Sequence, residues 1–336
     1  MRIKIGGEFD INPDLINGFE QFDLSLNNFL FSSGRVALMK ILKINKTKTK
    51  TKLIIYLPYY VCSSVIEACK KQKYSIKFYE IDENFLFDIN QIQKIKMNST
   101  LLTLNYFGFV NDNYILEKVK NIRPDITTIS DNVQSLQQCH KSIADFSFTS
   151  LRKCLPVPDG ALIYCKGILL KPEKNVIENE FYKFKLLGSI SKYNNQNDKI
   201  YLNYFEKGEK LLAEEKKITK ACRFSEYTYQ NFDFEKYNKI REENYTNVYK
   251  LGSQIGLNFI FPYSKGIKPL CIPILLKNRD EVRKRLFKRN IFLPVHWSLN
   301  QYNYKSEFSN KMANNELSLL IDHRYSINEI EYQLNE

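Results

Sequence analysis

Short apolar segments alternate with segments of helical pattern over the first half of the chain, and this alternation restricts the possible folds. The apolar segments are KLIIYLP (52–58), IKFYEID (76–82), STLLTLNYF (99–107), DITTISDN (125–132), DFSFTS (145–150) and ALIYC (161–165). Between the first two, SSVIEACKKQ (63–72) places apolar residues at helical spacing. Strands of this kind, joined by helices, form mostly parallel sheets covered on both faces. We therefore predict an α/β fold.

The second half of the chain changes character twice. Residues 166–250 are polar, rich in Lys, Glu, Asn and Tyr, and helical in pattern. From about residue 268 the alternation resumes, with KPLCIPILL as a strand, RDEVRKRLFKRN as a helix and IFLPVHW as a strand. We predict a large α/β domain over residues 1–225 and a smaller α+β domain over residues 226–336.

The basic charge of the chain does not indicate a nucleic-acid-binding protein. Net charge is +13, but the lysines are spread along the sequence, and the one dense run, KTKTKTK (46–52), is predicted to be a solvated loop. No run reaches the roughly 18 apolar residues of a membrane span, and the N-terminus turns polar too early for a signal peptide. We expect a cytoplasmic protein that binds neither nucleic acid nor membrane.

The cysteines and histidines do not suggest a metal site. None of the seven cysteines forms a CxxC pair, and the three histidines lie far apart. We expect no metal, and most cysteines to be small buried apolar residues.

A candidate anion-binding turn opens the segment SSGRVALMKIL (32–42). Two serines and Gly34 precede a clean helical pattern, and free N–H groups at a helix N-terminus bind anions such as phosphate. The alternative is purely structural, with Ser32 or Ser33 as the helix N-cap and Gly34 in a tight turn.

Two more residues could carry chemistry. Asp131 follows the run TTIS, so it falls at the carboxyl end of a strand, where open α/β sheets bind ligands; its alternative role is an N-cap. Lys153 follows the strand DFSFTS in a turn-rich stretch, and a lysine held in a site can form a Schiff base with an aldehyde. A solvent-facing loop lysine is the alternative.

Taken together and in order, these segments resemble the DegT/DnrJ/EryC1/StrS family of fold-type I pyridoxal-phosphate sugar aminotransferases. SSGRVAL is similar to the family's phosphate-binding Ser-Gly-Thr-x-Ala-Leu, and SDNVQSL to its Asp-x-x-Gln motif. Lys153 with Gly160 matches the Lys…Glu-Gly-Gly spacing, with Asp159 in the Glu position. Other resembling segments are LPYYVCSSVIEA, LNYFGF, CIPILLKNRDEVRKRLFKRNIFLPVHW and LSLLIDHRYSINEIEYQL.

The resemblance implies a seven-stranded type of sheet and a role for each matching residue. Lys153 would bind the cofactor, pyridoxal 5'-phosphate, and act as the catalytic base. Asp131 would keep the pyridine nitrogen protonated, and Gln134 would contact the ring oxygen. The remaining cofactor-binding residues would be Gly34, Arg35 and Ser150 at the phosphate and Tyr60 against the ring.

The resemblance further implies an aminotransferase that moves an amino group from an amino acid, with glutamate as the expected donor. The acceptor would be a keto-sugar nucleotide in surface-polysaccharide or related sugar biosynthesis, and the enzyme would be a homodimer. The alternatives are a pyridoxal-phosphate enzyme acting on a non-sugar ketone or catalysing another reaction, and a non-catalytic homologue. Dehydratases of the family carry histidine in place of lysine, so Lys153 disfavours that reaction.

The sequence also departs from the family pattern. Arg35 stands where threonine is usual, Ala161 replaces the second glycine, and the stretch from Phe146 to Lys153 is one residue longer. Residues 166–225 lack the Gly-x-Asn-x-Arg segment that in the family reaches the partner's site and the sugar.

Overall fold

Seven strands form the central sheet of the computed structural model, which describes residues 3–12, 29–48, 53–298 and 305–335. Their order is β3-β2-β4-β5-β6-β7-β8. The first five are mutually parallel, whereas β7 and β8 run antiparallel to their neighbours. The strands are β2 (Ile54–Pro58), β3 (Ser75–Tyr79), β4 (Thr100–Leu104), β5 (Thr127–Asp131), β6 (Phe146–Ser150), β7 (Ala161–Cys165) and β8 (Ile168–Leu170). The predicted mostly parallel α/β sheet is confirmed.

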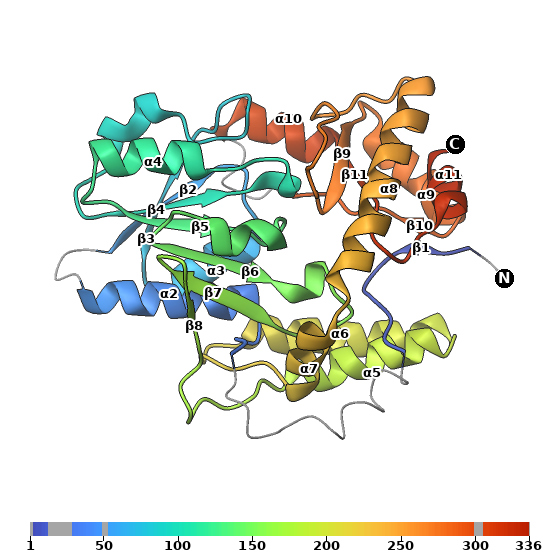
Figure 1. Cartoon of the computed structure of the whole chain (residues 1–336), viewed down its shortest axis with the longest axis horizontal. Helices are drawn as coiled ribbons and strands as arrows, with labels where there is room; N and C mark the ends of the chain where they lie inside the picture. Colours follow the sequence, from blue (N-terminus) through green and yellow to red (C-terminus); the bar gives the residue numbers. More distant parts are fainter. Residues whose placement is uncertain (1–2, 13–28, 49–52, 299–304, 336) are drawn as a thin grey trace.

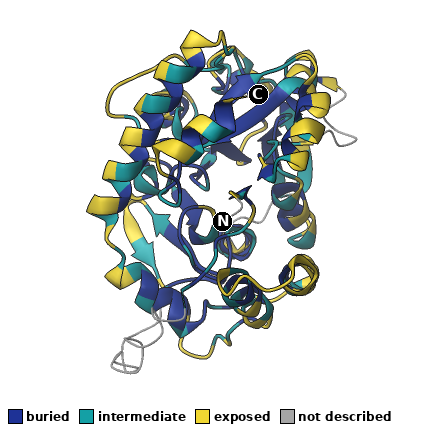
Figure 2. Cartoon of the chain, turned by 90° about the vertical axis from the view of Figure 1, so that its right-hand side faces the viewer, coloured by how far each residue is buried: buried dark blue, intermediate teal, exposed yellow. Residues whose placement is uncertain are grey.

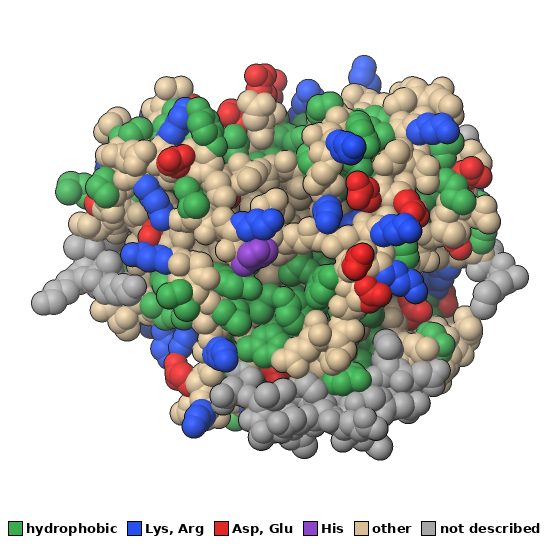
Figure 3. Space-filling model, in the orientation of Figure 1, with side chains coloured by type: hydrophobic (Ala, Val, Ile, Leu, Met, Phe, Trp, Pro, Cys, Tyr) green, Lys and Arg blue, Asp and Glu red, His purple; other side chains and the backbone are tan. Residues whose placement is uncertain are grey.

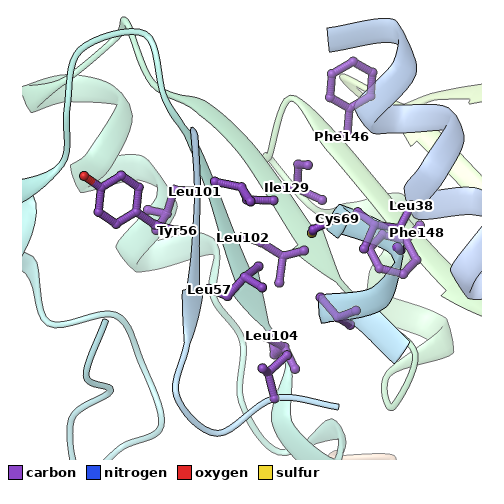
Figure 4. Packing of buried hydrophobic residues seen from close by; sticks show 14 of the residues in the cluster. Leu38, Tyr56, Leu57, Cys69, Leu101, Leu102, Leu104, Ile129, Phe146 and Phe148 are labelled. Atoms are coloured by element: carbon purple, nitrogen blue, oxygen red, sulfur yellow. The ribbon is translucent and has the colours of Figure 1, made fainter. Parts of the chain in front are cut away.

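Helices cover both faces of this sheet. α2 (Gly34–Lys48) and α3 (Ser63–Lys71) pack together on one face, and α4 (Asn113–Ile122) lies on the other (Figure 1). The central strand β4 is buried along its whole length, which explains its unbroken apolar run. Leu57, Leu102 and Ile129 from three adjacent strands meet Leu38 and Cys69 from the two helices in the core (Figure 4).

The polar segment 166–250 folds mainly into helices, as predicted, but its first residues form the strand β8 instead. α5 (Phe181–Tyr193) and α6 (Asp198–Glu214) form a close antiparallel pair. Two glycines permit the close approach, since a Cβ at Gly188 would lie 2.7 Å from the ring of Phe205 and one at Gly208 would lie 3.0 Å from Lys185. α7 (Arg223–Asn231) and the long α8 (Phe234–Gln254) then lead to the C-terminal part of the chain.

A second apolar core lies in the C-terminal part and consists of buried residues between Tyr245 and Leu334 together with Ile5. β9 (Cys271–Leu275) pairs antiparallel with β11 (Glu316–Leu320), and β1 (Ile5–Gly6) pairs parallel with β10 (Ile291–Phe292). The helices α8, α9 (Arg279–Lys288), α10 (Glu307–Asn315) and α11 (Ile327–Leu334) surround these strands, with exposed residues on their outer faces (Figure 2). The boundary at residues 225 and 226 stays a prediction.

Two predicted segments differ in the structure. Within IFLPVHW only Ile291–Phe292 forms a strand; further along, Pro294 has no N–H to donate and accepts instead from Ser318 N. The run KTKTKTK was predicted to be a loop, but α2 continues through Lys48, and residues 49–52 lie outside the described part.

The surface agrees with the dispersed charge of the sequence. On the face in Figure 3, Lys and Arg side chains are scattered among acidic and neutral ones. Among the described helices, none is both long and apolar enough to cross a lipid bilayer. Five of the seven cysteines are buried, and all seven are free thiols.

Candidate active site

A cavity of about 790 Å³ opens at the carboxyl ends of the parallel strands. Leu104, Asp131 and Ser150, the last residues of β4, β5 and β6, line it. The C-terminal part of the chain supplies further wall residues, among them Arg241 and Asp322. Of the seven residues predicted for the site, the cavity wall contains Gly34, Arg35, Asp131, Gln134, Ser150 and Lys153.

Asp131 presents a buried carboxyl group to this cavity. It is 7% exposed, and its Oδ1 accepts a hydrogen bond of 2.9 Å from the backbone N–H of Val133. Burial raises its pKa to about 7, although the Val133 N–H partly offsets this. The next helical turn begins at Leu136 with Ser135 as its cap, so Asp131 is not a helix N-cap. A cationic group in the cavity would favour the ionised carboxylate.

In the side-chain amide of Gln134, the oxygen has a hydrogen-bond partner and the nitrogen has none among the described residues. Its Oε1 accepts from Phe107 N at 2.8 Å, while its Nε2 is buried and has no partner among the described residues. A buried N–H donor without an acceptor costs about 1–3 kcal/mol. Because Gln134 lines the cavity, a ligand oxygen beside Nε2 would remove that cost.

The start of α2 forms one side of the cavity beside Ser150. Ser33 Oγ accepts from Val36 N at 3.2 Å, so Ser33 acts as a cap, as one of the two sequence interpretations expected. Gly34 lies so close to β6 that an added Cβ would be 3.3 Å from Cβ of Ser150. The small residues and the helix N-terminus leave room for an anion.

Lys153 closes a short 3-10 turn, η5 (Leu151–Lys153), directly after β6. Its side chain is exposed on the cavity wall and makes no hydrogen bond or ion pair with the described residues. The described residues therefore leave this amine accessible from the cavity. The neighbouring Arg152 instead pairs with Glu209 at 3.2 Å and Glu8 at 3.5 Å.

Asp159, which matches the Glu position of the family motif, supports the structure from outside the cavity. It is fully buried and accepts hydrogen bonds from Asn179 Nδ2, Cys222 N and Ser225 Oγ at 2.5–2.9 Å. Burial raises its pKa to about 6, although these donors oppose the shift. The carboxyl group thus connects the residues just before β7 to Asn179, which precedes α5, and to Cys222 and Ser225 at the start of α7.

Two predicted residues have other surroundings than expected. Arg35 lines the cavity, but its Nη1 donates to Leu212 O at 2.9 Å and its Nη2 lies 3.4 Å from Glu67 Oε2. Tyr60 does not belong to the cavity wall. It is fully buried, with its ring stacked on Tyr106 at 5.7 Å and edge-on to Trp297 at 5.0 Å.

Sequence reasoning missed several residues of the wall. Asn105 directly follows β4, and its backbone N–H donates to Asp131 O at 3.0 Å; its place after a buried strand was a usable signal. Glu8, Arg241, Asp322 and Arg324 come from separate parts of the chain, and nothing in their local sequence indicates a shared cavity.

By sequence, the chain matches no protein-family model and none of the curated proteins. By structure, it is similar to many solved chains. Spr1654 of Streptococcus pneumoniae, assigned as a sugar aminotransferase and solved in its PMP form, aligns with a TM-score of 0.67 at 13% identity, over 98% of this chain and 90% of that one. A DegT DnrJ EryC1 StrS aminotransferase from Brucella abortus aligns with a TM-score of 0.61 at 10% sequence identity, over 97% of this chain and 90% of that one.

An E. coli GDP-4-keto-6-deoxy-D-mannose-3-dehydratase with bound hydrated PLP aligns with a TM-score of 0.63 at 16% sequence identity, over 96% of this chain and 90% of that one. The chain thus has the fold of the pyridoxal-phosphate-dependent transferases. Within that class, its arrangement is the one seen in sugar aminotransferases and in this dehydratase, over nearly the whole chain.

Proposed function

We propose that this protein is a pyridoxal-phosphate-dependent aminotransferase with Lys153 as its catalytic residue. The observation that carries the proposal is the buried carboxyl group of Asp131 on the wall of the cavity that Lys153 also lines. The structural Asp159 is also buried, but it accepts from three donors, whereas the carboxyl group of Asp131 accepts only from Val133 N among the described residues and faces the cavity. A protonated pyridine nitrogen would supply the missing partner.

The residues on the wall fit this cofactor. Asp131 would bind the ring nitrogen, and the unpaired Nε2 of Gln134 would donate to the ring oxygen. Gly34, Ser150 and the N-terminus of α2 would bind the phosphate; Arg35 would add a donor only by leaving Leu212 and Glu67. We retain Tyr60 only as support for Trp297, which packs on it and lines the cavity.

The bound cofactor would supply an aldehyde for amine exchange and a ring that withdraws electrons. Nζ of Lys153 would hold the cofactor and, when released, would move a proton between the substrate carbon and the cofactor carbon. Asp131 would keep the ring nitrogen protonated throughout. Since the side chain of Lys153 is exposed, binding of cofactor and substrate would also exclude water from around its Nζ.

For the substrates, we propose glutamate as donor and a keto-sugar nucleotide as acceptor, in surface-polysaccharide or related sugar biosynthesis. The likeness in fold to sugar aminotransferases supports the acceptor class, and the arginines on the cavity wall suit an anionic substrate. Such substrates are intracellular, so we place the enzyme in the cytoplasm. Release of 2-oxoglutarate from glutamate in the presence of individual keto-sugars tests this assignment; turnover only with non-sugar ketones would favour the alternative acceptor.

We further propose that the enzyme works as a homodimer. Large apolar side chains are exposed along the α5–α6 pair and nearby, including Leu187, Ile200 and Leu202 at 46%, 45% and 54%. A second copy that covers this surface would remove them from water. Sedimentation of the purified protein tests the assignment, and a monomer at working concentrations would contradict it.

The cofactor proposal has a direct spectroscopic test. Protein purified with added pyridoxal phosphate should absorb visible light, and borohydride should fix the cofactor to the peptide that contains Lys153. Lys153→Ala should abolish both effects, while Lys166→Ala, in the turn between β7 and β8, should change neither. Protein that takes up no cofactor would support the non-catalytic alternative.

A further inference from the structure

A second hollow, apart from the active-site cavity, has lysines on its wall. Its volume is about 470 Å³, and none of the residues that line it lines the cavity, among those the structure describes. Four lysines line it against one acidic residue, Glu173. Two come from α2 and two from the segment after α6: Lys40, Lys43, Lys216 and Lys217. We call this hollow the basic pocket; the proposed transamination uses none of these side chains.

Three of the four ammonium groups have no partner within the described part of the chain. Nζ of Lys40 lies 2.5 Å from Oε1 of Glu173, and this pair is neutral. For Lys43, Lys216 and Lys217, no described carboxylate lies within 4.0 Å of Nζ, and no described residue makes a hydrogen bond with it. These like charges repel one another, and a bound anion would offset the repulsion.

The neighbouring acidic residues do not neutralise the pocket. The hydrogen bond from Lys40 lowers the pKa of Glu173, and the charge of Lys43 adds to this effect, so that one carboxylate serves two lysines. Glu215 lies outside the pocket wall, and its Oε1 accepts from the backbone N–H of Lys217 at 2.8 Å. Four lysines and one glutamate leave the pocket with a net charge of +3.

The shape of the pocket restricts the anion that it can hold. Small-molecule sites have volumes of roughly 300–1,000 Å³, so the basic pocket suits a small ligand. Lysine binds phosphate as a point charge, and lysines from two separate segments suit two or more adjacent phosphates better than one. Nucleic acid would instead need its cations in a stripe along the surface. The remaining wall is apolar or neutral: Phe31, Gln72, Asn175, Val176, Ile177 and Ile218.

The basic pocket spans the joint between α2 and the end of α6. Arg35, at the start of α2, donates to Leu212 O at 2.9 Å, and Lys71, from α3, donates to two carbonyls that follow it at 2.7 Å each. Leu212 lines the active-site cavity. An anion held between α2 and the two lysines after α6 would add a contact across the same joint and stabilise this wall of the cavity.

We propose that the basic pocket binds a ligand with adjacent phosphate groups and that this ligand ties the end of α6 to α2. The ligand would be an inorganic oligophosphate or the phosphate chain of a free nucleotide. The pocket is then a second anion site, which acts on the active-site cavity through the α6 wall. Because neither cofactor nor substrate takes part, the cofactor-free protein serves for every test.

Calorimetric titration of tripolyphosphate into the cofactor-free protein tests the site. The double variant Lys43→Gln/Lys217→Gln should bind at least tenfold more weakly than wild type. The matched control, Lys94→Gln/Lys96→Gln, removes the same charge from exposed lysines outside both hollows and should stay within about twofold of wild type. Equal affinity in wild type and the first variant, or an equal loss in both variants, would overturn the site.

Two single variants exclude a damaged fold and binding in the active-site cavity. Glu173→Gln should bind tripolyphosphate several-fold more tightly, because it frees Lys40 for the ligand, whereas a damaged fold would bind more weakly. Gly34→Ala, which fills the space proposed for the cofactor phosphate, should stay within about twofold of wild type. Weaker binding by Glu173→Gln, or a loss in Gly34→Ala alone, would overturn the site.

Hydrogen exchange measures the tie between α6 and α2. Tripolyphosphate should slow amide exchange over residues 209–218 in wild type but not in Lys43→Gln/Lys217→Gln, and unchanged exchange in wild type would overturn the tie.

Titrations with ATP and UTP identify the source of the phosphates. Affinities within about threefold of tripolyphosphate would assign the site to oligophosphates in general, and a nucleotide that binds at least tenfold more tightly would assign it to that nucleotide. Tighter binding of a short DNA duplex, lost in Lys43→Gln/Lys217→Gln, would make the surface a nucleic-acid interface and overturn the proposal.

Discussion

The backbone N–H of Gly160 donates to the carbonyl of Ser32 at 2.8 Å, and this bond joins the residue before β7 to the turn before α2. The carbonyl of Gly160 in turn accepts from Leu151 N at 2.9 Å. One residue thus connects the turn before α2 with the turn that carries Lys153. The backbone conformation at residue 160 has a φ of +117°, which favours glycine over residues with a Cβ.

Gly160→Ala should destabilise the protein and loosen the site. Gly160 has a φ of +117°, and an added Cβ would lie 3.0 Å from Cδ1 of Leu151. We expect a loss of about 1–3 kcal/mol from backbone strain, with up to about 1–3 kcal/mol more from overpacking, measured by urea unfolding. Gly167→Ala is the matched control, since Gly167 has a φ of +78° with no atom within 4 Å of the added Cβ. Equal losses in the two variants would show that the Leu151 contact is unimportant.

The carboxyl ends of the strands could be predicted from sequence because they follow clear apolar runs. Asp131, Ser150 and Lys153 end or follow such runs, and parallel strands bring these ends to one edge. The sheet and the first core were predictable for the same reason. Tyr60 was not, because whether an aromatic residue reaches a cavity or a core depends on how Tyr106 and Trp297 pack around it.

The far wall of the cavity could not be predicted. Arg241 lies in a polar helix among many charged residues, and its significance depends on which of its nitrogens find carbonyls from residues 269 and 270. Likewise IFLPVHW has strand composition, but strand pairing with β1 extends over only two residues. Such outcomes depend on tertiary contacts that no local pattern encodes.

Asp131→Asn should make the cofactor-free protein more stable at pH 8 while it abolishes cofactor binding. The pKa of Asp131 is raised to about 7 in the folded protein, against about 3.9 when unfolded. The folded state therefore holds a proton that the unfolded state releases, so stability falls as pH rises from about 4 to about 7. The amide removes this loss, which we expect to be on the order of 2–4 kcal/mol at pH 8.

Unfolding curves of the Asp131 variant at pH 4 and pH 8 give the measurement, and Asp125→Asn serves as the control of opposite sign. Arg123 lowers the pKa of Asp125 to about 2, so that carboxylate stabilises the fold above pH 4 and Asp125→Asn should cost stability there. A loss of stability at pH 8 in Asp131→Asn would contradict the raised pKa.

Gly34→Ala should separate folding from cofactor binding. Alanine is the better helix former, but Gly34 is the first residue of α2 and the added Cβ makes a tight contact with Ser150, so we expect the stability of the cofactor-free protein to stay within about 1 kcal/mol of wild type. The new methyl group, 3.3 Å from Cβ of Ser150, would occupy the space proposed for the phosphate and raise the Kd for pyridoxal phosphate at least tenfold. Ser33→Ala is the comparison, because it removes the cap of α2 and should lower stability by about 1 kcal/mol. Unchanged cofactor affinity in Gly34→Ala would place the phosphate elsewhere.

Lys185→Met should weaken the contact between the N-terminal segment and the α5–α6 pair. Lys185 is 1% exposed, and its Nζ lies 2.5 Å from Glu8 and 2.6 Å from Glu209. Together with Arg152 it overcomes the effect of burial and lowers the pKa of Glu209 to about 2. Removal of the lysine leaves two carboxylates with only Arg152 between them. Because both carboxylates are partly exposed, we expect about 2–3 kcal/mol, below the 3–5 kcal/mol of a fully buried pair.

The matched control is Lys183→Met, two residues earlier on the same helix. Lys183 pairs with Glu180 at 3.0 Å, but both side chains are more than half exposed, so no measurable change in the free energy of unfolding is expected. Since Glu8 lies beside Gly7 and Phe9 on the cavity wall, Lys185→Met should also expose the N-terminal segment to proteolysis under native conditions. Equal stability and equal cleavage in the two variants would show that the buried charge cluster does not hold the N-terminal segment at the cavity.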